Sequence, residues 1–154
     1  MAALRLLFVC SGNTCRSPMA AGLARKILAR RLGCDIDALE RHGIVVESAG
    51  TGGGHGPASE HTVAVMAARG IDLSGHVSSS LRAEAVQQAD HVFAMTRAQV
   101  EAALALAPGA ADRVCRLLEN EDVTDPFGAG RESYEACALK IEQGVESCLR
   151  EVCT

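Results

Sequence analysis

Several features that mark other classes of protein are missing from this chain of 154 residues. No run approaches the roughly 20 apolar residues that a helix needs to cross a bilayer, so we expect no membrane span. The formal net charge of −4 lacks the basic surplus that binding to a nucleic-acid backbone requires, and we expect no nucleic-acid partner. No long polar tract interrupts a composition that is 48% hydrophobic. The length suits one compact domain over residues 1–154.

The seven cysteines also lack the spacing of a disulfide framework or of a metal site. An odd number without a regular pattern favours reduced thiols and a cytoplasmic protein. No two of them show zinc-ligand spacing, so we expect no metal and no other cofactor. The apolar start of the chain has no cleavage-site pattern, and we expect it to form a strand rather than a signal peptide.

Apolar runs alternate with segments of helical periodicity along the chain. The runs predict strands, and the periodic segments predict helices. The expected strands lie at 4–9, 44–50, 91–96 and 114–118, and the expected helices at 17–31, 61–69, 81–88, 97–107 and 131–152. Such alternation is typical of a parallel sheet covered on both faces. We therefore expect an α/β fold, a single three-layer domain with a four-stranded parallel sheet flanked by helices.

Residues 10–18 (CSGNTCRSP) follow directly on the first apolar run, so Cys10 lies where a buried strand ends and a helix begins. Ser17 and Pro18 suit the N-cap and first turn of that helix. In parallel sheets, ligands bind beyond the carboxyl ends of the strands. Backbone N–H groups, the helix start and the charge of Arg16 would stabilise a phosphoryl dianion there. The same field favours the nucleophilic thiolate of Cys10. The segment therefore predicts a cysteine nucleophile in an anion-binding loop.

The loop segment, with its continuation into Met19 and Ala20, resembles the phosphate loop of the low-molecular-weight protein tyrosine phosphatases. Four further segments also resemble that family and occur in its order: SAGT at 48–51, HVSS at 76–79, ADHVFAMT at 89–96 and DPFG at 125–128. Together they cover nearly the whole chain. The motifs are most similar to those of the bacterial protein-arginine phosphatases. The resemblance implies the phosphatase fold of this family and hydrolysis of phosphorylated protein side chains by a monomer.

The resemblance also implies roles for individual residues. Cys10 attacks phosphorus, Arg16 binds two phosphoryl oxygens, and Ser17 hydrogen-bonds the thiolate. Asn13 holds the strained shape of the loop, and Asp125 is the general acid. The whole phosphate loop comprises Ser11, Gly12, Asn13, Thr14, Cys15, Arg16 and Ser17.

The chemistry of these residue types agrees with the implied roles. A thiolate can form a phosphocysteine and so divide a difficult hydrolysis into two steps. The planar fork of Arg16 matches the phosphoryl oxygens. The leaving group needs a proton, so a carboxylic acid must come from another loop. Asp125, restrained by Pro126, is our candidate; Asp122 and Glu121 are the alternatives.

Two positions bear on the substrate. Tyrosine-directed relatives often carry an aliphatic residue where this chain has Thr14, and many have a pair of aromatic residues where it has only Phe127. A hydroxyl at the pocket rim could orient a guanidinium or a water molecule, whereas an aliphatic side chain would pack against a phenol. We therefore favour phosphoarginine, with phosphotyrosine as the alternative. An arsenate reductase of this fold would need additional cysteines, and residues 74–90 contain none.

Other candidates have simpler interpretations. Cys15 either forms a disulfide with oxidised Cys10, as in the family, or packs beneath the loop as a small side chain. The run Gly52–Gly54 is expected to be a flexible loop. The histidines have no evident partner in the sequence, and the mechanism needs no imidazole. We expect structural or surface positions for His42, His55, His61, His76 and His91.

Overall fold

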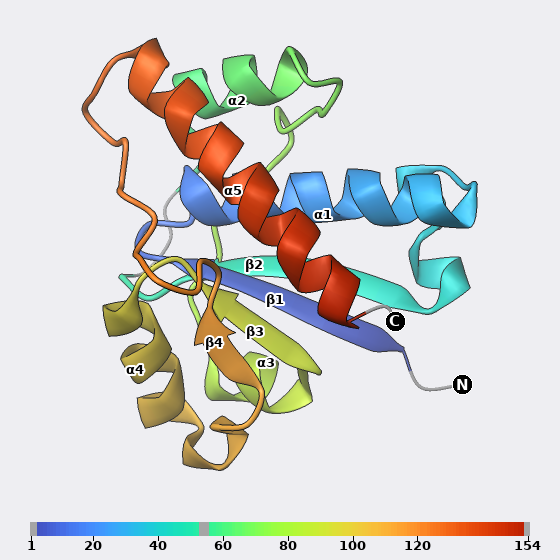
Figure 1. Ribbon diagram of the computed structural model, residues 1–154, viewed down its shortest axis with the longest axis vertical. Helices are drawn as coiled ribbons and strands as arrows, with labels where there is room; N and C mark the ends of the chain where they lie inside the picture. Colours follow the sequence, from blue (N-terminus) through green and yellow to red (C-terminus); the bar gives the residue numbers. More distant parts are fainter. Residues whose placement is uncertain (1–2, 53–55, 153–154) are drawn as a thin grey trace.

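The computed structural model describes residues 3–52 and 56–152. Four parallel strands form one sheet in the order β2-β1-β3-β4 (Figure 1). The strands are β1 (Leu4–Cys10), β2 (Ile44–Gly50), β3 (His91–Ala94) and β4 (Val114–Arg116). The α-helices are α1 (Arg16–Leu32), α2 (Glu60–Ala67), α3 (Ala83–Gln88), α4 (Arg97–Leu106) and α5 (Arg131–Val152). Short 3-10 turns lie at η1 (Ile36–Ala38), η2 (Glu40–His42) and η3 (Pro108–Ala110).

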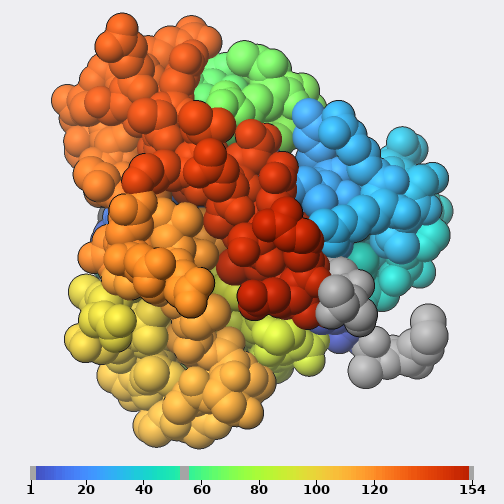
Figure 2. Space-filling model, viewed as in Figure 1, coloured from blue at the N-terminus to red at the C-terminus, as the bar shows by residue number. Residues whose placement is uncertain are grey.

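Alternation along β1 divides the core into two layers. Leu6 and Phe8 belong to the cluster that packs against α1, α2 and α5, whereas Leu7 and Val9 belong to the cluster beneath α3 and α4. Successive strand side chains point to opposite faces, so the central strand is buried on both sides. Figure 2 shows α5 lying across one face, beside α1 and α2. The predicted three-layer α/β architecture is confirmed.

The end of β1 is held between its two neighbours. Cys10 is in register with Gly50 of β2, and Val9 is in register with Ala94 of β3. All four strands run in the same direction, so the loops that follow them gather at one edge of the sheet (Figure 1). This edge brings residues 11–15 close to segments far away in the sequence. No helix in the described ranges is long and apolar enough to span a bilayer.

Several predicted boundaries were wrong, each for a local reason. Helix α1 begins at Arg16 with Cys15 as its N-cap residue, so Ser17 is not the N-cap; its hydroxyl instead lies 2.9 Å from Cys10 Sγ. Strand β3 ends at Ala94 because a capping box formed by Thr96 and Gln99 starts α4. Periodicity also did not reveal the 3-10 turns, which are too short to carry a pattern.

The remaining boundaries differ by a few residues. Helix α2 begins one residue earlier than expected, because Ser59 caps it by accepting a hydrogen bond from Thr62 N. It ends at Ala67, and the chain then turns at Gly70, which has a φ of 75°. Helix α3 begins at Ala83 rather than 81, and β4 ends at Arg116 rather than 118.

Candidate active site

The loop after β1 is shaped by Asn13. Its φ of 55° is the only positive φ among the described non-glycine residues, and such a conformation is uncommon for a side chain other than Asn or Asp. Asn13 is fully buried. Its Nδ2 donates to Ser17 Oγ (2.7 Å) and Ser48 Oγ (2.9 Å), and its Oδ1 accepts from Ser79 N (2.8 Å). These bonds hold the backbone in a shape that it would not adopt alone.

A second loop holds the carbonyl of the same residue. His76 Nε2 donates to Asn13 O at 2.8 Å, and Ser78 Oγ donates to it at 3.1 Å. Sequence reasoning assigned His76 only to a structural or surface position and gave it no partner. The available signal was the HVSS segment at 76–79, whose resemblance to the family includes this histidine. His61 packs its ring against Tyr134, and His55 lies outside the described residues.

Cys10 lies buried at the base of the loop. Its Sγ is 2.9 Å from Ser17 Oγ, and it accepts a hydrogen bond from Asn13 N at 3.2 Å. Ser17 Oγ accepts from Asn13 Nδ2, and its single proton can go to the sulfur at 2.9 Å or to Ala49 O at 3.5 Å. The sulfur therefore lies within hydrogen-bonding distance of one backbone N–H and one hydroxyl.

Arg16 joins the loop to a distant segment. Its guanidinium is buried, and Nη1 donates to Val123 O at 2.8 Å. Nη2 lies 3.5 Å from Asp125 Oδ2. Nε has no hydrogen-bond partner, and it is the only such buried side-chain nitrogen or oxygen among the described residues. A buried N–H group without an acceptor is unfavourable, and an oxyanion bound at this point would satisfy it.

Asp125 is the carboxylate that reaches this site. Its Oδ1 accepts a hydrogen bond from Phe127 N at 3.1 Å, which turns the DPFG segment back on itself. The side chain is half exposed. It therefore has access both to Arg16 and to an incoming group.

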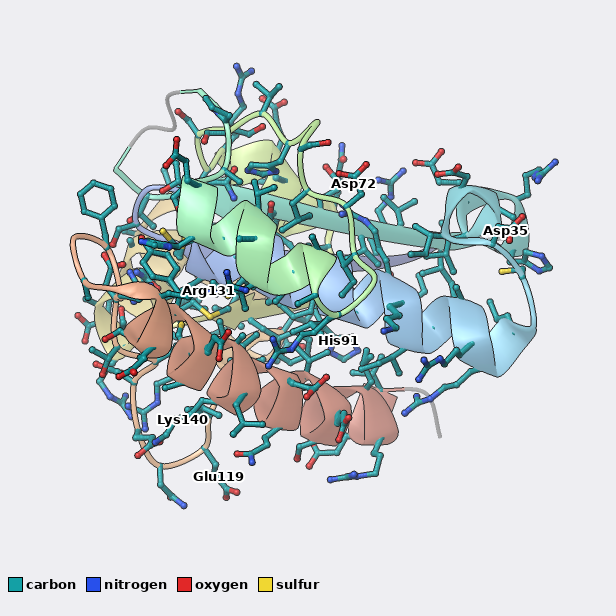
Figure 3. The ribbon with its side chains drawn as sticks, turned by 90° about the horizontal axis from the view of Figure 1, so that it is seen from above. Asp35, Asp72, His91, Glu119, Arg131 and Lys140 are labelled. Atoms are coloured by element: carbon teal, nitrogen blue, oxygen red, sulfur yellow. The ribbon has the colours of Figure 1, made fainter. Side chains whose placement is uncertain are left out.

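The two alternative acids are committed elsewhere. Asp122 Oδ1 accepts from Arg97 N at 3.0 Å and from Arg116 Nη1 at 2.9 Å, and these bonds lower the pKa of Asp122. Asp122 therefore stays ionised and is a poor proton donor. Glu121 forms an ion pair with Lys140 of α5. The Lys140 side chain lies on the outer side of the molecule (Figure 3).

A cavity of about 210 Å³ brings these groups together. The lining residues are Cys10, Gly12, Thr14, Cys15, Arg16, Asp125 and Phe127. The structure thus places both proposed substrate-selecting residues, Thr14 and Phe127, on the wall of the cavity that holds the cysteine, the arginine and the carboxylate. The Phe127 side chain is 72% exposed and lies at the mouth.

Cys15 is buried at the wall of the cavity, where it contacts the N-cap residue of α2 and the first turn of α5. Its Sγ lies 3.5 Å from both Ser59 Oγ and Tyr134 Oη. Burial raises the pKa of the Tyr134 phenol, so this group remains neutral. A further thiol, Cys137 of α5, lies nearby, and burial raises its pKa to about 12.

Of the expected loop Gly52–Gly54, only Gly52 is described; its N–H donates to Ser11 O at 2.9 Å.

Fold and site together define a class. A strand, a loop of the form Cys-x5-Arg and a helix, on the edge of a four-stranded parallel sheet, make up a protein phosphatase with an anion-binding loop. The chain belongs to the family described as low molecular weight phosphotyrosine protein phosphatase, which it matches over residues 5–154. The predicted family and enzyme class are confirmed.

Relatives in this family carry two different substrate names. A protein-arginine-phosphatase from Geobacillus stearothermophilus is 36% identical over 144 residues, covering 90% of this chain and 88% of the relative. A low molecular weight protein-tyrosine-phosphatase from Streptomyces coelicolor is 33% identical over 160 residues, covering 96% and 93%. The crystal structure of a low molecular weight protein tyrosine phosphatase from T. tengcongensis has a TM-score of 0.83 at 34% identity and covers 97% of this chain and 99% of that one.

We predict that Gly50→Ala impairs the site. A Cβ at Gly50 would lie 2.6 Å from Ser11 O and 3.1 Å from Asn13 N, so the phosphate loop itself must shift. A shift of about 1 Å at a reacting centre costs up to about a hundredfold in rate, and we expect kcat/KM to fall at least tenfold. Gly109→Ala, which meets nothing within 4 Å, is the matched control. Wild-type kcat/KM in Gly50→Ala would contradict this account.

Proposed function

We propose that this enzyme hydrolyses phosphorylated protein side chains through a phosphocysteine at Cys10, with phosphoarginine as its main substrate. The observation that carries the proposal is the buried Nε of Arg16, which has no partner and belongs to the same cavity as Cys10 and Asp125. A phosphoryl dianion satisfies this donor and the charge of the guanidinium together.

In the first step, the Cys10 thiolate attacks phosphorus in line with the leaving group. A bond forms between sulfur and phosphorus, and the bond from phosphorus to the leaving atom breaks. Asp125 gives its proton to that atom, so the arginine or tyrosine side chain leaves in its protonated form. Phosphate oxygens that bind the Arg16 guanidinium replace its contact with Asp125 Oδ2, now 3.5 Å from Nη2, and leave the Asp125 carboxyl group free to face the leaving atom.

In the second step, water attacks the phosphocysteine. Asp125, now a carboxylate, accepts a proton from the water as the new bond to phosphorus forms. The bond between sulfur and phosphorus breaks, and Cys10 leaves as a thiolate. Ser17 Oγ at 2.9 Å and Asn13 N at 3.2 Å stabilise the negative charge on the leaving sulfur. Inorganic phosphate then dissociates.

The lining of the cavity supports phosphoarginine. A guanidinium has several N–H donors, and acceptor oxygens for them are available in the Thr14 hydroxyl and the half-exposed carboxyl group of Asp125. A phenol presents no such donors once its oxygen is phosphorylated. The relative from Geobacillus stearothermophilus carries the name of an arginine phosphatase.

Phosphotyrosine is the second candidate. The Phe127 ring is 72% exposed at the mouth of the cavity, where it offers an apolar surface to a phenyl ring. The relative from Streptomyces coelicolor carries the name of a tyrosine phosphatase.

The mechanism predicts different losses for two variants. Cys10→Ser should lower kcat by about 10⁴-fold or more because the nucleophile is removed, while the dissociation constant of inorganic phosphate, measured by calorimetry, stays near the wild-type value. Asp125→Asn should lower turnover of phosphopeptides about a hundredfold, the effect of a lost general acid. Its loss on p-nitrophenyl phosphate should be smaller, because nitrophenolate leaves without a proton. Turnover by Cys10→Ser at a wild-type rate would overturn the mechanism.

Thr14→Ile tests the substrate preference. We expect the ratio of kcat/KM for phosphoarginine to that for phosphotyrosine peptides to fall about tenfold, which corresponds to one lost hydrogen bond and added apolar surface. Thr14→Val removes the hydroxyl with little change in shape, and Thr14→Ser keeps the hydroxyl. The ratio should fall in Thr14→Val and stay in Thr14→Ser. An unchanged ratio in Thr14→Ile means that this position is not the selector.

We also propose that Cys15 protects oxidised Cys10. Hydrogen peroxide transfers one oxygen to the Cys10 thiolate, giving a sulfenic acid and hydroxide. Cys15 sulfur then attacks Cys10 sulfur, the S–O bond breaks, and the departing hydroxide takes the thiol proton as water. Cys137 is a poor competitor because burial raises its pKa to about 12.

Peroxide treatment followed by peptide mass mapping should therefore show a bond between Cys10 and Cys15, and a thiol reductant should restore activity. In Cys15→Ser, the same treatment should give Cys10 sulfinic acid, which the reductant does not reverse. A disulfide between Cys10 and Cys137 would contradict this assignment.

A further inference from the structure

The first turn of α4 lies between the phosphate loop and the segment that carries Asp125. Gln99, one turn into this helix, is 4% exposed although its side chain is polar. Its Oε1 accepts from Thr96 N at 3.0 Å and from Met95 N at 3.1 Å, and its Nε2 donates to Ser11 Oγ at 3.0 Å. A buried amide that is hydrogen-bonded at both ends has a defined orientation.

Gln99 closes a continuous ring of hydrogen bonds around the site. From Ser11 the ring passes through the Gln99 carboxamide to Met95 N. Met95 O then accepts from Val123 N at 2.8 Å, and Val123 O accepts from Arg16 Nη1 at 2.8 Å. Arg16 belongs to the same loop as Ser11. The ring therefore begins and ends in the phosphate loop and includes the strand end and the acid segment.

A neighbouring contact fixes the acid segment to the same helical turn. Arg97 N donates to Asp122 Oδ1 at 3.0 Å, directly before Val123. The acid segment is thus held by a backbone N–H of α4, whereas the start of the phosphate loop is held by a side chain of α4, that of Gln99. The loop carbonyl at Ser11 is held from the opposite side by Gly52 N.

We propose that Gln99 is a positioning residue that fixes the phosphate loop relative to the acid segment, so that Asp125 meets the leaving atom. This inference rests on the proposed function. Loss of the Gln99 side chain should therefore slow the proton transfer to the leaving group more than it weakens phosphate binding. Leaving groups that need a proton should therefore report the loss, and activated leaving groups should report less of it.

The test compares Gln99→Met with Thr96→Val on two substrates, a phosphopeptide and p-nitrophenyl phosphate. Thr96→Val removes the other half of the capping box, including the bond from Gln99 N to Thr96 Oγ1, but leaves the contact with Ser11. We expect Gln99→Met to lower kcat/KM on the phosphopeptide about tenfold more than on p-nitrophenyl phosphate, the upper range for one hydrogen bond. Thr96→Val should lower both equally.

Two further variants separate positioning from stability. Gln99→Glu keeps the acceptor for Met95 N and Thr96 N and can accept a bond from Ser11 Oγ, so it should fold and retain the wild-type ratio between substrates. Ser11→Ala should reproduce the ratio of Gln99→Met, and the double variant should lose no more than either alone.

The outcomes are distinguishable. Equal losses on both substrates in Gln99→Met, or additive losses with Ser11→Ala, would overturn the positioning role while the phosphatase function stands. A wild-type enzyme that hydrolyses p-nitrophenyl phosphate but no phosphopeptide would overturn the proposed function and the positioning role with it.

Discussion

The left-handed backbone of Asn13 is the constraint on which the site depends. At a φ of 55°, the loop reverses tightly enough for Asn13 N to reach Cys10 Sγ, three residues back along the chain, before the helix begins at Arg16. This conformation is costly for an L residue. Hydrogen bonds from two other segments, including Ser48 and His76, offset the cost. The loop around Cys10 is therefore held by residues that are distant in sequence.

The parallel sheet explains why those residues meet. Each strand ends at the same edge, so the segments after β1, β2, β3 and β4 must share the space beyond it. Arg16 connects two of these segments. It is the first residue of α1, after β1, and its side chain donates a hydrogen bond to Val123 O in the segment after β4. The guanidinium that we propose to bind the phosphoryl group is thus also the group that contacts the segment carrying Asp125.

Hydrogen bonds and burial decide which of the candidate groups are available for chemistry. Three carboxylates occur within residues 121–125, and the sequence favoured Asp125 only through the neighbouring Pro126 and the family resemblance. In the structure, Asp122 is held by Arg97 and Arg116, whereas Asp125 reaches the cavity. The cysteines divide in the same way. Cys10 receives donors, whereas burial raises the pKa of Cys137 to about 12.

Much of the fold was predictable because its signals are local. The apolar run of β1, the periodicity of α5 and the glycine and proline content of the loops each act over a few residues. The boundary at Arg16 was missed because Ser17 is a favourable N-cap residue by type. In the structure its hydroxyl contacts Cys10 Sγ instead of capping the helix. Gln99 was missed because it looks like an ordinary first-turn residue, and its partner Ser11 is 88 positions away.

By itself, the sequence determined the alternation of strands and helices, the cysteine at the end of the first strand, and the Cys-x5-Arg spacing. These depend on neighbours along the chain, and local backbone preference is enough to specify them. Only the tertiary structure decided that Asp125 rather than Asp122 reaches the cavity, that His76 holds Asn13, that Cys15 packs on Tyr134, and that Gln99 binds Ser11. Those choices depend on burial and on hydrogen bonds between segments that meet only when the sheet has formed.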